Sequence, residues 1–289
     1  MKSCSLQTGA ICAAFAVSHC AADPAINQFE IKDLEVELGQ LEFQSQNAHS
    51  WDHPDRQFVI DGDGELEFDD TTITRRRHAL EFEYGTTEWM RNRIGIELEQ
   101  ENLDDPPSPA RANDFATFQL EEIALEGVIV FIPTERHFGA GLLIEYQYLL
   151  DPSEADSLVF GPILEARFGR WDFIINPTLV QFFAGTPQDN KLDFAYGAHA
   201  LYTVNDQWTV GAETYGTIER IGRTGTRSEA YRLFGDHDFH RIGPISYYRK
   251  TFGDGDDDGQ ILTIGTGFFI GLNEDTSRYT LKWSIEYEF

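Results

Sequence analysis

Apolar and polar side chains alternate in most segments from about residue 39 to the end of the chain. In the last eleven residues, YTLKWSIEYEF (279–289), bulky apolar side chains hold the odd positions and polar ones the even positions. This period of two is typical of a strand with one apolar and one polar face. The same pattern recurs in segments 40–51, 78–85, 93–101, 137–148, 157–168 and 191–202.

The connections between these segments alternate between short and long. Short turns are expected at 85–88, 133–136, 169–170 and 205–207, and longer polar links at 52–71, 102–114, 151–156, 185–190 and 219–228. A soluble β-sandwich also has alternating strands. Short turns on one rim and long loops on the other are instead typical of an outer-membrane barrel.

Three of the five tryptophans support the barrel over the sandwich. Trp89, Trp171 and Trp208 each follow one of the short turns and open a strand. Aromatic side chains gather where a membrane barrel meets the lipid–water interface. These three tryptophans are therefore predicted to form an aromatic girdle at the periplasmic rim.

Some segments fit the pattern less well. Pro162, Pro177 and Pro244 fall inside strand-like segments, so bulges are expected there. Alternation is lost within 114–132, and 229–250 is either one long strand or two short ones. One strand gives twelve in total and two give thirteen; the even number is usual for a bacterial single-chain barrel. We therefore predict an all-β fold, a transmembrane antiparallel up-and-down barrel of about twelve strands at residues 39–289.

The N-terminus resembles a secretory signal peptide. Lys2 precedes a short apolar run at 10–17 and the small residues before Asp23, which predicts a signal peptide at 1–22 and an N-terminal periplasmic segment at 23–38. Cys20 could mark a lipoprotein site, but His19 stands where a small residue is expected. All three cysteines lie in the first twenty residues, so the exported chain is expected to lack disulfides.

Composition restricts the function further. No stretch reaches the roughly 18 apolar residues of a membrane-spanning helix. The formal charge of −27 makes binding to nucleic acid through its phosphates very unfavourable. Such an acidic balance serves solubility in many proteins, or it lines a surface or pore that concentrates cations.

The C-terminal residues carry a resemblance to known proteins. The final aromatic strand, with Trp283, Tyr287 and Phe289, is similar to the signal that the barrel-assembly machinery reads in Gram-negative outer-membrane proteins. Residues 265–283 resemble the end of a proteobacterial outer-membrane family that is linked by name to phenol-degradation pathways and loosely to transport. The resemblance implies a barrel inserted in outer-membrane lipid, and it supplies no catalytic residues.

Several motifs could carry chemistry. DGDDDG (254–259) spaces three aspartates like a calcium loop, but Gly265 stands where a bidentate glutamate is required, so a solvated turn is the better interpretation. The same holds for DGDGE (61–65). The clusters HSWDH (49–53) and DHDFH (236–240) could bind a metal or activate water as in an outer-membrane protease, but ordinary loop polarity is the better interpretation. We expect no catalytic residue, metal or cofactor.

The polar face of the strands is the more general candidate site. If the bulky side chains face lipid, ten acids and six bases face the lumen, an arrangement that either fills a narrow barrel with ion pairs or forms a small cation-favouring channel. The members of this inward set are Glu42, Glu81, Glu83, Glu97, Glu99, Glu145, Glu165, Asp193, Glu213, Glu286, Arg75, Arg77, Arg91, Arg93, Arg167 and Lys282.

These observations together predict an outer-membrane channel or transporter for an unidentified small solute, and not an enzyme. Two alternatives remain open. An outer-membrane hydrolase or protease would bring His237 or His240 against a carboxylate, and a structural barrel would have a blocked lumen.

Overall fold

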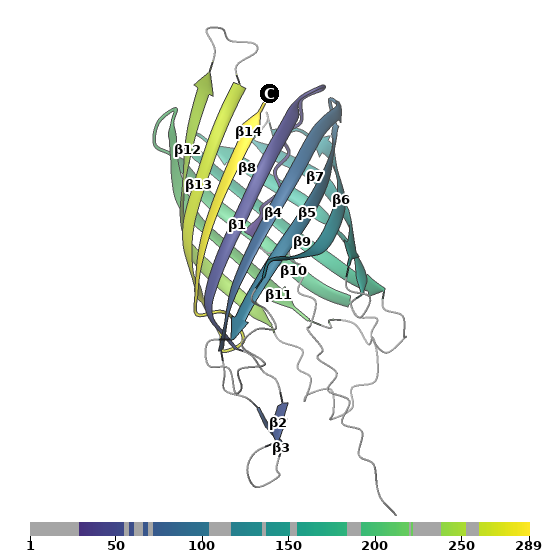
Figure 1. Ribbon diagram of the computed structural model, residues 1–289. Helices are drawn as coiled ribbons and strands as arrows, with labels where there is room; N and C mark the ends of the chain where they lie inside the picture. Colours follow the sequence, from purple (N-terminus) through teal and green to yellow (C-terminus); the bar gives the residue numbers. More distant parts are fainter. Residues whose placement is uncertain are drawn as a thin grey trace, which may run out of the picture.

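The protein is a closed, twelve-stranded antiparallel barrel, as predicted (Figure 1). The computed structural model describes residues 29–54, 58–60, 66–68, 72–103, 117–134, 137–150, 155–183, 192–219, 221, 238–252 and 260–289. The barrel strands are β1 (Leu41–Pro54), β4 (Thr72–Thr87), β5 (Met90–Leu103), β6 (Gln119–Ile132), β7 (Phe138–Leu149), β8 (Asp156–Phe168), β9 (Trp171–Phe183), β10 (Leu192–Thr203), β11 (Trp208–Ile218), β12 (Phe239–Phe252), β13 (Gln260–Gly271) and β14 (Tyr279–Glu288).

Each barrel strand pairs with the barrel strands before and after it along the chain, and β14 closes the barrel against β1. In that closing ladder Glu42 lies opposite Glu288 and Trp51 lies opposite Tyr279. A separate two-stranded hairpin, β2 (Phe58–Ile60) with β3 (Leu66–Phe68), lies beyond the lower rim in Figure 1. No helix in the described part of the chain is long and apolar enough to cross a membrane.

The side-chain alternation divides the wall into an apolar outer face and a polar inner face. On β4, Phe82 and Tyr84 are exposed, whereas Glu81 and Glu83 between and beside them are buried. On β7, Ile144 and Tyr146 are exposed around the buried Glu145. A polar inside and an apolar outside are the arrangement that a membrane barrel requires.

Two of the bulges occur where alternation is lost in the sequence, and none of them lies at the three prolines. The β5–β6 register shifts between Glu97 and Leu98 of β5. The β6–β7 register shifts between Val130 and Ile132 of β6. Each bulge inserts one residue and moves the following side chains to the other face. This explains the irregular pattern within 114–132.

The expectation of bulges at Pro162, Pro177 and Pro244 was wrong. The β8–β9 register is the same on both sides of the two prolines, because Phe160 pairs with Leu179 and Leu164 with Ile175. The β12–β13 register is likewise unchanged across Pro244. The missing N–H groups remove ladder hydrogen bonds without inserting a residue.

The three predicted girdle tryptophans share one rim. Trp171 and Trp208 open β9 and β11, and Trp89 lies in the turn before β5. This is the rim at which β14 ends and the C-terminus lies (Figure 1). All three side chains are exposed, at 52%, 45% and 44% for Trp89, Trp171 and Trp208.

Residues 29–37 lie inside the barrel rather than outside it. The sequence predicts a periplasmic segment at 23–38, and within it Phe29, Lys32 and Leu34 are buried against the inner wall. We call residues 29–37 the luminal segment. The apolar side chains of Ile31 and Leu34 meet inward-facing apolar patches of the wall, which explains why the segment enters the lumen.

Candidate functional site

The lumen is the candidate site, and the structure brings the predicted inward set together there. All sixteen side chains lie on the inner face of the wall, and most are buried. Arg167 is the most open of the bases, with 42% of its side chain exposed near the C-terminal rim. The structure adds inward-facing charges that the sequence analysis did not select, namely Glu122, Glu126 and Arg241.

Arg93 is the centre of the main ion-pair network. Its guanidinium contacts Glu81 at 3.0 Å and Glu83 at 2.8 Å on the neighbouring strand, and it also bonds Glu30 of the luminal segment. Burial alone raises the pKa of Glu30, but Arg93 and Lys32 outweigh burial and lower the pKa to about 2. Glu30 is therefore a carboxylate over the physiological pH range.

Lys32, Asp33 and Glu35 of the luminal segment are also paired. Lys32 contacts both Glu30 and Glu126. Asp33 accepts a 2.8 Å hydrogen bond from Arg91, and Glu35 contacts Arg167 at 2.8 Å. Glu30, Asp33 and Glu35 thus meet wall arginines, and the one base of the segment meets Glu126 of the wall as well as Glu30 of the segment itself.

The backbone of the luminal segment is fixed by Asn176 on β9. The Lys32 N–H donates to Asn176 Oδ1 at 2.7 Å, and Asn176 Nδ2 donates to the Lys32 carbonyl oxygen at 3.0 Å. Two residues further, Leu34 fits against Gly139 and Gly141 of β7, where an added Cβ would come within 2.6 Å of the leucine side chain. These contacts give the segment one defined position.

Two further networks fill other parts of the lumen. Arg75 and Arg77 of β4 share Glu99 of β5, at 2.8 and 3.1 Å. On the far side, Lys282 contacts Glu213 at 2.9 Å and the Tyr215 hydroxyl at 2.8 Å. Cross-strand pairs of this kind need the register, which the alternation pattern does not give.

Two buried wall carboxylates face each other, and only Glu97 has a base nearby, the guanidinium of Arg77 at 3.6 Å. Glu97 and Glu122 lie directly opposite each other on β5 and β6, both about 1% exposed. The Oε1 atom of Glu122 has no hydrogen-bond partner among the described residues. The inner wall therefore holds acidic side chains, such as Glu122, for which the described residues provide no ion pair.

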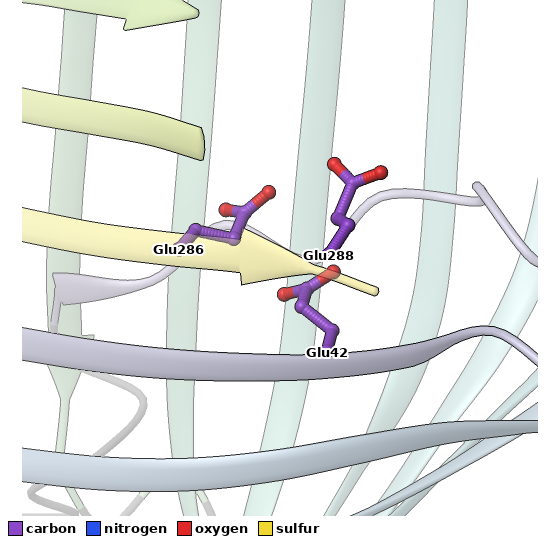
Figure 2. Close-up of side chains that lie close together, drawn as sticks. All are labelled: Glu42, Glu286 and Glu288. Carbon is purple, nitrogen blue, oxygen red and sulfur yellow. The ribbon is translucent and has the colours of Figure 1, made fainter. Parts of the chain in front are cut away.

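A group of three carboxylates lies at the mouth of the lumen near the C-terminal rim. Figure 2 shows Glu42 on β1 beside Glu286 and Glu288 of β14, and one oxygen of each lies within 4.8 Å of the others. We call them the mouth carboxylates. They line a cavity of about 100 Å³ together with Gln44 and Gln46. The oxygens could hold a hard cation such as Ca²⁺, but three carboxylates alone do not define a metal site.

The histidine clusters do not assemble into a catalytic group within the described residues. His53 bonds the Ser277 hydroxyl at 3.0 Å, and His49 stacks on Trp51. His240 Nδ1 lies 3.0 Å from the Tyr196 hydroxyl, so its bonded neighbour there is a phenol rather than a carboxylate. Asp236, His237 and the aspartate motifs at 61–65 and 254–259 lie outside the described residues.

The C-terminal residues named as an assembly signal lie on the closing strand. Trp283 and Phe289 are exposed on the outer face, and Tyr287 packs edge-on against Phe289. The Phe289 N–H donates to the Leu41 carbonyl oxygen at 2.9 Å. The last residue therefore completes the seam between the first and last strands.

Comparison with solved structures supports the fold. The chain is similar to the COG4313 outer membrane channel from Pseudomonas putida F1, with a TM-score of 0.57 and 10% identity over 90% of this chain and 99% of that one. The translocator domain of autotransporter NalP from Neisseria meningitidis matches with a TM-score of 0.43 and 10% identity, over 89% and 90% of the two chains. No family model matches the chain, and no curated protein matches it by sequence.

Proposed function

We propose that this protein is an outer-membrane channel for small solutes, and not an enzyme, with a lumen that favours cations. The observation that carries the proposal is the group of mouth carboxylates, which line a cavity near the C-terminal rim of the lumen. Arg249 lies 3.9 Å from Glu288, and Arg91, Arg93 and Lys282 line the same cavity. Fixed negative charge in a confined, poorly screened passage attracts cations and repels anions.

The fold is compatible with this function. The protein from Pseudomonas putida F1 that shares the fold is an outer membrane channel. The apolar outer face, the girdle tryptophans and the predicted signal peptide are consistent with insertion into the outer membrane. The proposal names no particular solute. The link to phenol-degradation pathways rests on the resemblance of residues 265–283.

Ion selectivity in planar bilayers tests the proposal. We expect the wild type to be cation-selective across a salt gradient, more strongly at low salt, where screening is weak. A Glu42→Gln, Glu286→Gln, Glu288→Gln variant should shift the reversal potential toward zero. These positions are better suited than Glu99, since Glu99 neutralises Arg75 and Arg77.

A matched control removes charge outside the lumen. Glu88 and Asp206 lie in turns at the same rim, so Glu88→Gln with Asp206→Asn should leave selectivity unchanged. An anion-selective wild type, or a control that shifts as much as the mouth variant, would contradict the proposal.

A closed structural barrel is the second candidate. The observation that favours it is the luminal segment, which occupies the interior and is bonded to several strands. If neither the wild type nor a variant with a loosened segment conducts ions, the structural role replaces the channel.

A further inference from the structure

The outer wall carries a polar patch where lipid should be. On β1 and β4, Asn47 lies directly opposite His78, and His49 lies directly opposite Arg76. These four side chains share the outer face with the apolar Leu80, Phe82 and Trp283, because they have the same parity along their strands. A charged side chain on the lipid face of a barrel is destabilising unless something compensates it.

Arg76 differs from the bases that line the lumen. The luminal bases Lys32, Arg93 and Lys282 each contact a carboxylate. The guanidinium of Arg76 is exposed, and within the described chain its hydrogen bond goes to the neutral amide oxygen of Gln100, at 3.3 Å. Its positive charge is thus available to an external anion, although the protein as a whole is strongly acidic.

A groove lies beside this patch. It has a volume of about 580 Å³ and is lined by the polar Arg76, His49 and His78 and by the apolar Leu98, Phe118 and Trp283. The Nε2 atom of His49 is buried and has no hydrogen-bond partner among the described residues. An apolar channel with a cationic end fits an acyl chain attached to a phosphate.

The height of Arg76 on the wall agrees with a lipid headgroup. Arg76 is eight residues from Tyr84, toward the rim with the long connections, which faces outward in such barrels. With a rise of about 3.3 Å per residue and a strand tilt of about 40°, the height difference between Tyr84 and Arg76 along the membrane normal is roughly 20 Å. The apolar band of such a barrel is about 25 Å tall. Arg76 therefore lies close to the outer headgroup level.

We propose that this groove binds a phosphorylated lipid of the outer leaflet, with lipid A as its chemical type. Arg76 holds the phosphate, His49 and His78 lie beside it, and an acyl chain packs along Leu98, Phe118 and Trp283. A second copy of this chain fits less well, since a two-fold contact through the patch would bring two Arg76 side chains together.

The test uses the purified full chain in detergent, titrated with lipid A and followed by native mass spectrometry. We expect Arg76→Gln to weaken lipid A binding about tenfold, the loss of one charge-assisted phosphate contact. Dephosphorylated lipid A should bind the wild type and Arg76→Gln equally. Leu98→Trp, which fills the groove, should weaken binding of both lipids.

The control variant is Lys250→Gln. Lys250 lies near the last residue of β12, over the ring of Phe252, and does not line the groove. Its replacement therefore removes a positive charge without changing the groove. Equal lipid A binding by the wild type and Arg76→Gln would overturn the proposal. So would an equal loss in Lys250→Gln, or a change in the ratio of monomer to dimer in Arg76→Gln without a change in lipid binding.

Discussion

Replacing Asn176 with alanine should loosen the luminal segment without unfolding the barrel. The asparagine side chain makes two hydrogen bonds to the Lys32 peptide, at 2.7 and 3.0 Å, and lies on β9, which keeps its own ladder. A hydrogen bond contributes about 1 kcal/mol net. Asn176→Ala should therefore lower the free energy that favours the bound luminal segment over the displaced one by about 2 kcal/mol. That free energy corresponds to a roughly 30-fold rise in the population of the displaced segment.

Hydrogen exchange measures this population. The Lys32 and Leu34 amides donate to Asn176 and Glu165, so they exchange only when the segment leaves the wall. In Asn176→Ala they should exchange about 30-fold faster, while amides of the barrel strands keep their wild-type rates. Water that enters to satisfy the Lys32 peptide would reduce the factor, and a peptide left unpaired in the wall would increase it.

Thr178→Ala is the matched control. Thr178 lies two residues further on β9, is buried to a similar degree, and donates to the Ala195 carbonyl oxygen of the wall rather than to the segment. Its loss should leave the exchange of Lys32 and Leu34 unchanged. Wild-type protection in Asn176→Ala, or an equal effect of Thr178→Ala, would refute the role assigned to Asn176.

Three further outcomes are expected. Arg93→Gln leaves Glu30, Glu81 and Glu83 without their shared cation and should lower the free energy of unfolding by about 3–5 kcal/mol in urea titrations, with Lys250→Gln near the wild type. Deletion of Phe289 should slow assembly into lipid, measured by the time course of folding with the assembly machinery; an unchanged rate would contradict the signal. Because the pKa of Glu30 is lowered to about 2, its contribution to holding the segment should be complete above about pH 4.5 and disappear as the pH falls toward 2. A carboxyl titration followed by NMR should therefore have its midpoint near 2 for Glu30, and a midpoint near 4.5 would count against the ion pair.

The wall of the barrel could be predicted from the sequence because one signal determines it. Alternation assigns each side chain to a face, and the faces of β4, β7 and β14 follow the pattern residue by residue. The signal fails in β6, where two bulges change the parity of the pattern and hide Glu122 and Glu126 from a reading based on alternation. No particular residue type identifies a bulge in the sequence. The interrupted alternation was therefore the only sequence signal for the bulges in β6.

The position of the luminal segment could not be predicted in the same way. Residues 29–37 form no strand, and their apolar side chains follow neither the two-residue period of a strand nor the 3.6-residue period of a helix. Their mixture of Glu30, Lys32 and Asp33 with Ile31 and Leu34 is compatible with a solvated linker as well as with a packed segment. Which it becomes depends on Asn176 and Arg93, which lie far away in the sequence and meet the segment only when the barrel has closed.

The luminal segment also changes what the lumen presents to a passing ion. Three of its four acids, Glu30, Asp33 and Glu35, contact Arg93, Arg91 and Arg167 of the wall, respectively. With the segment in place these arginines are paired, and in the proposed channel the carboxylates without an ion pair, such as Glu42, Glu122 and Glu286, would determine the sign of the interior. If the segment left, these arginines would keep only their wall carboxylates, such as Glu83 and Glu165, and more of their positive charge would act on the lumen. The cation preference proposed for the channel is therefore a property of the barrel with its segment bound, and the segment contributes to selectivity even though it narrows the path.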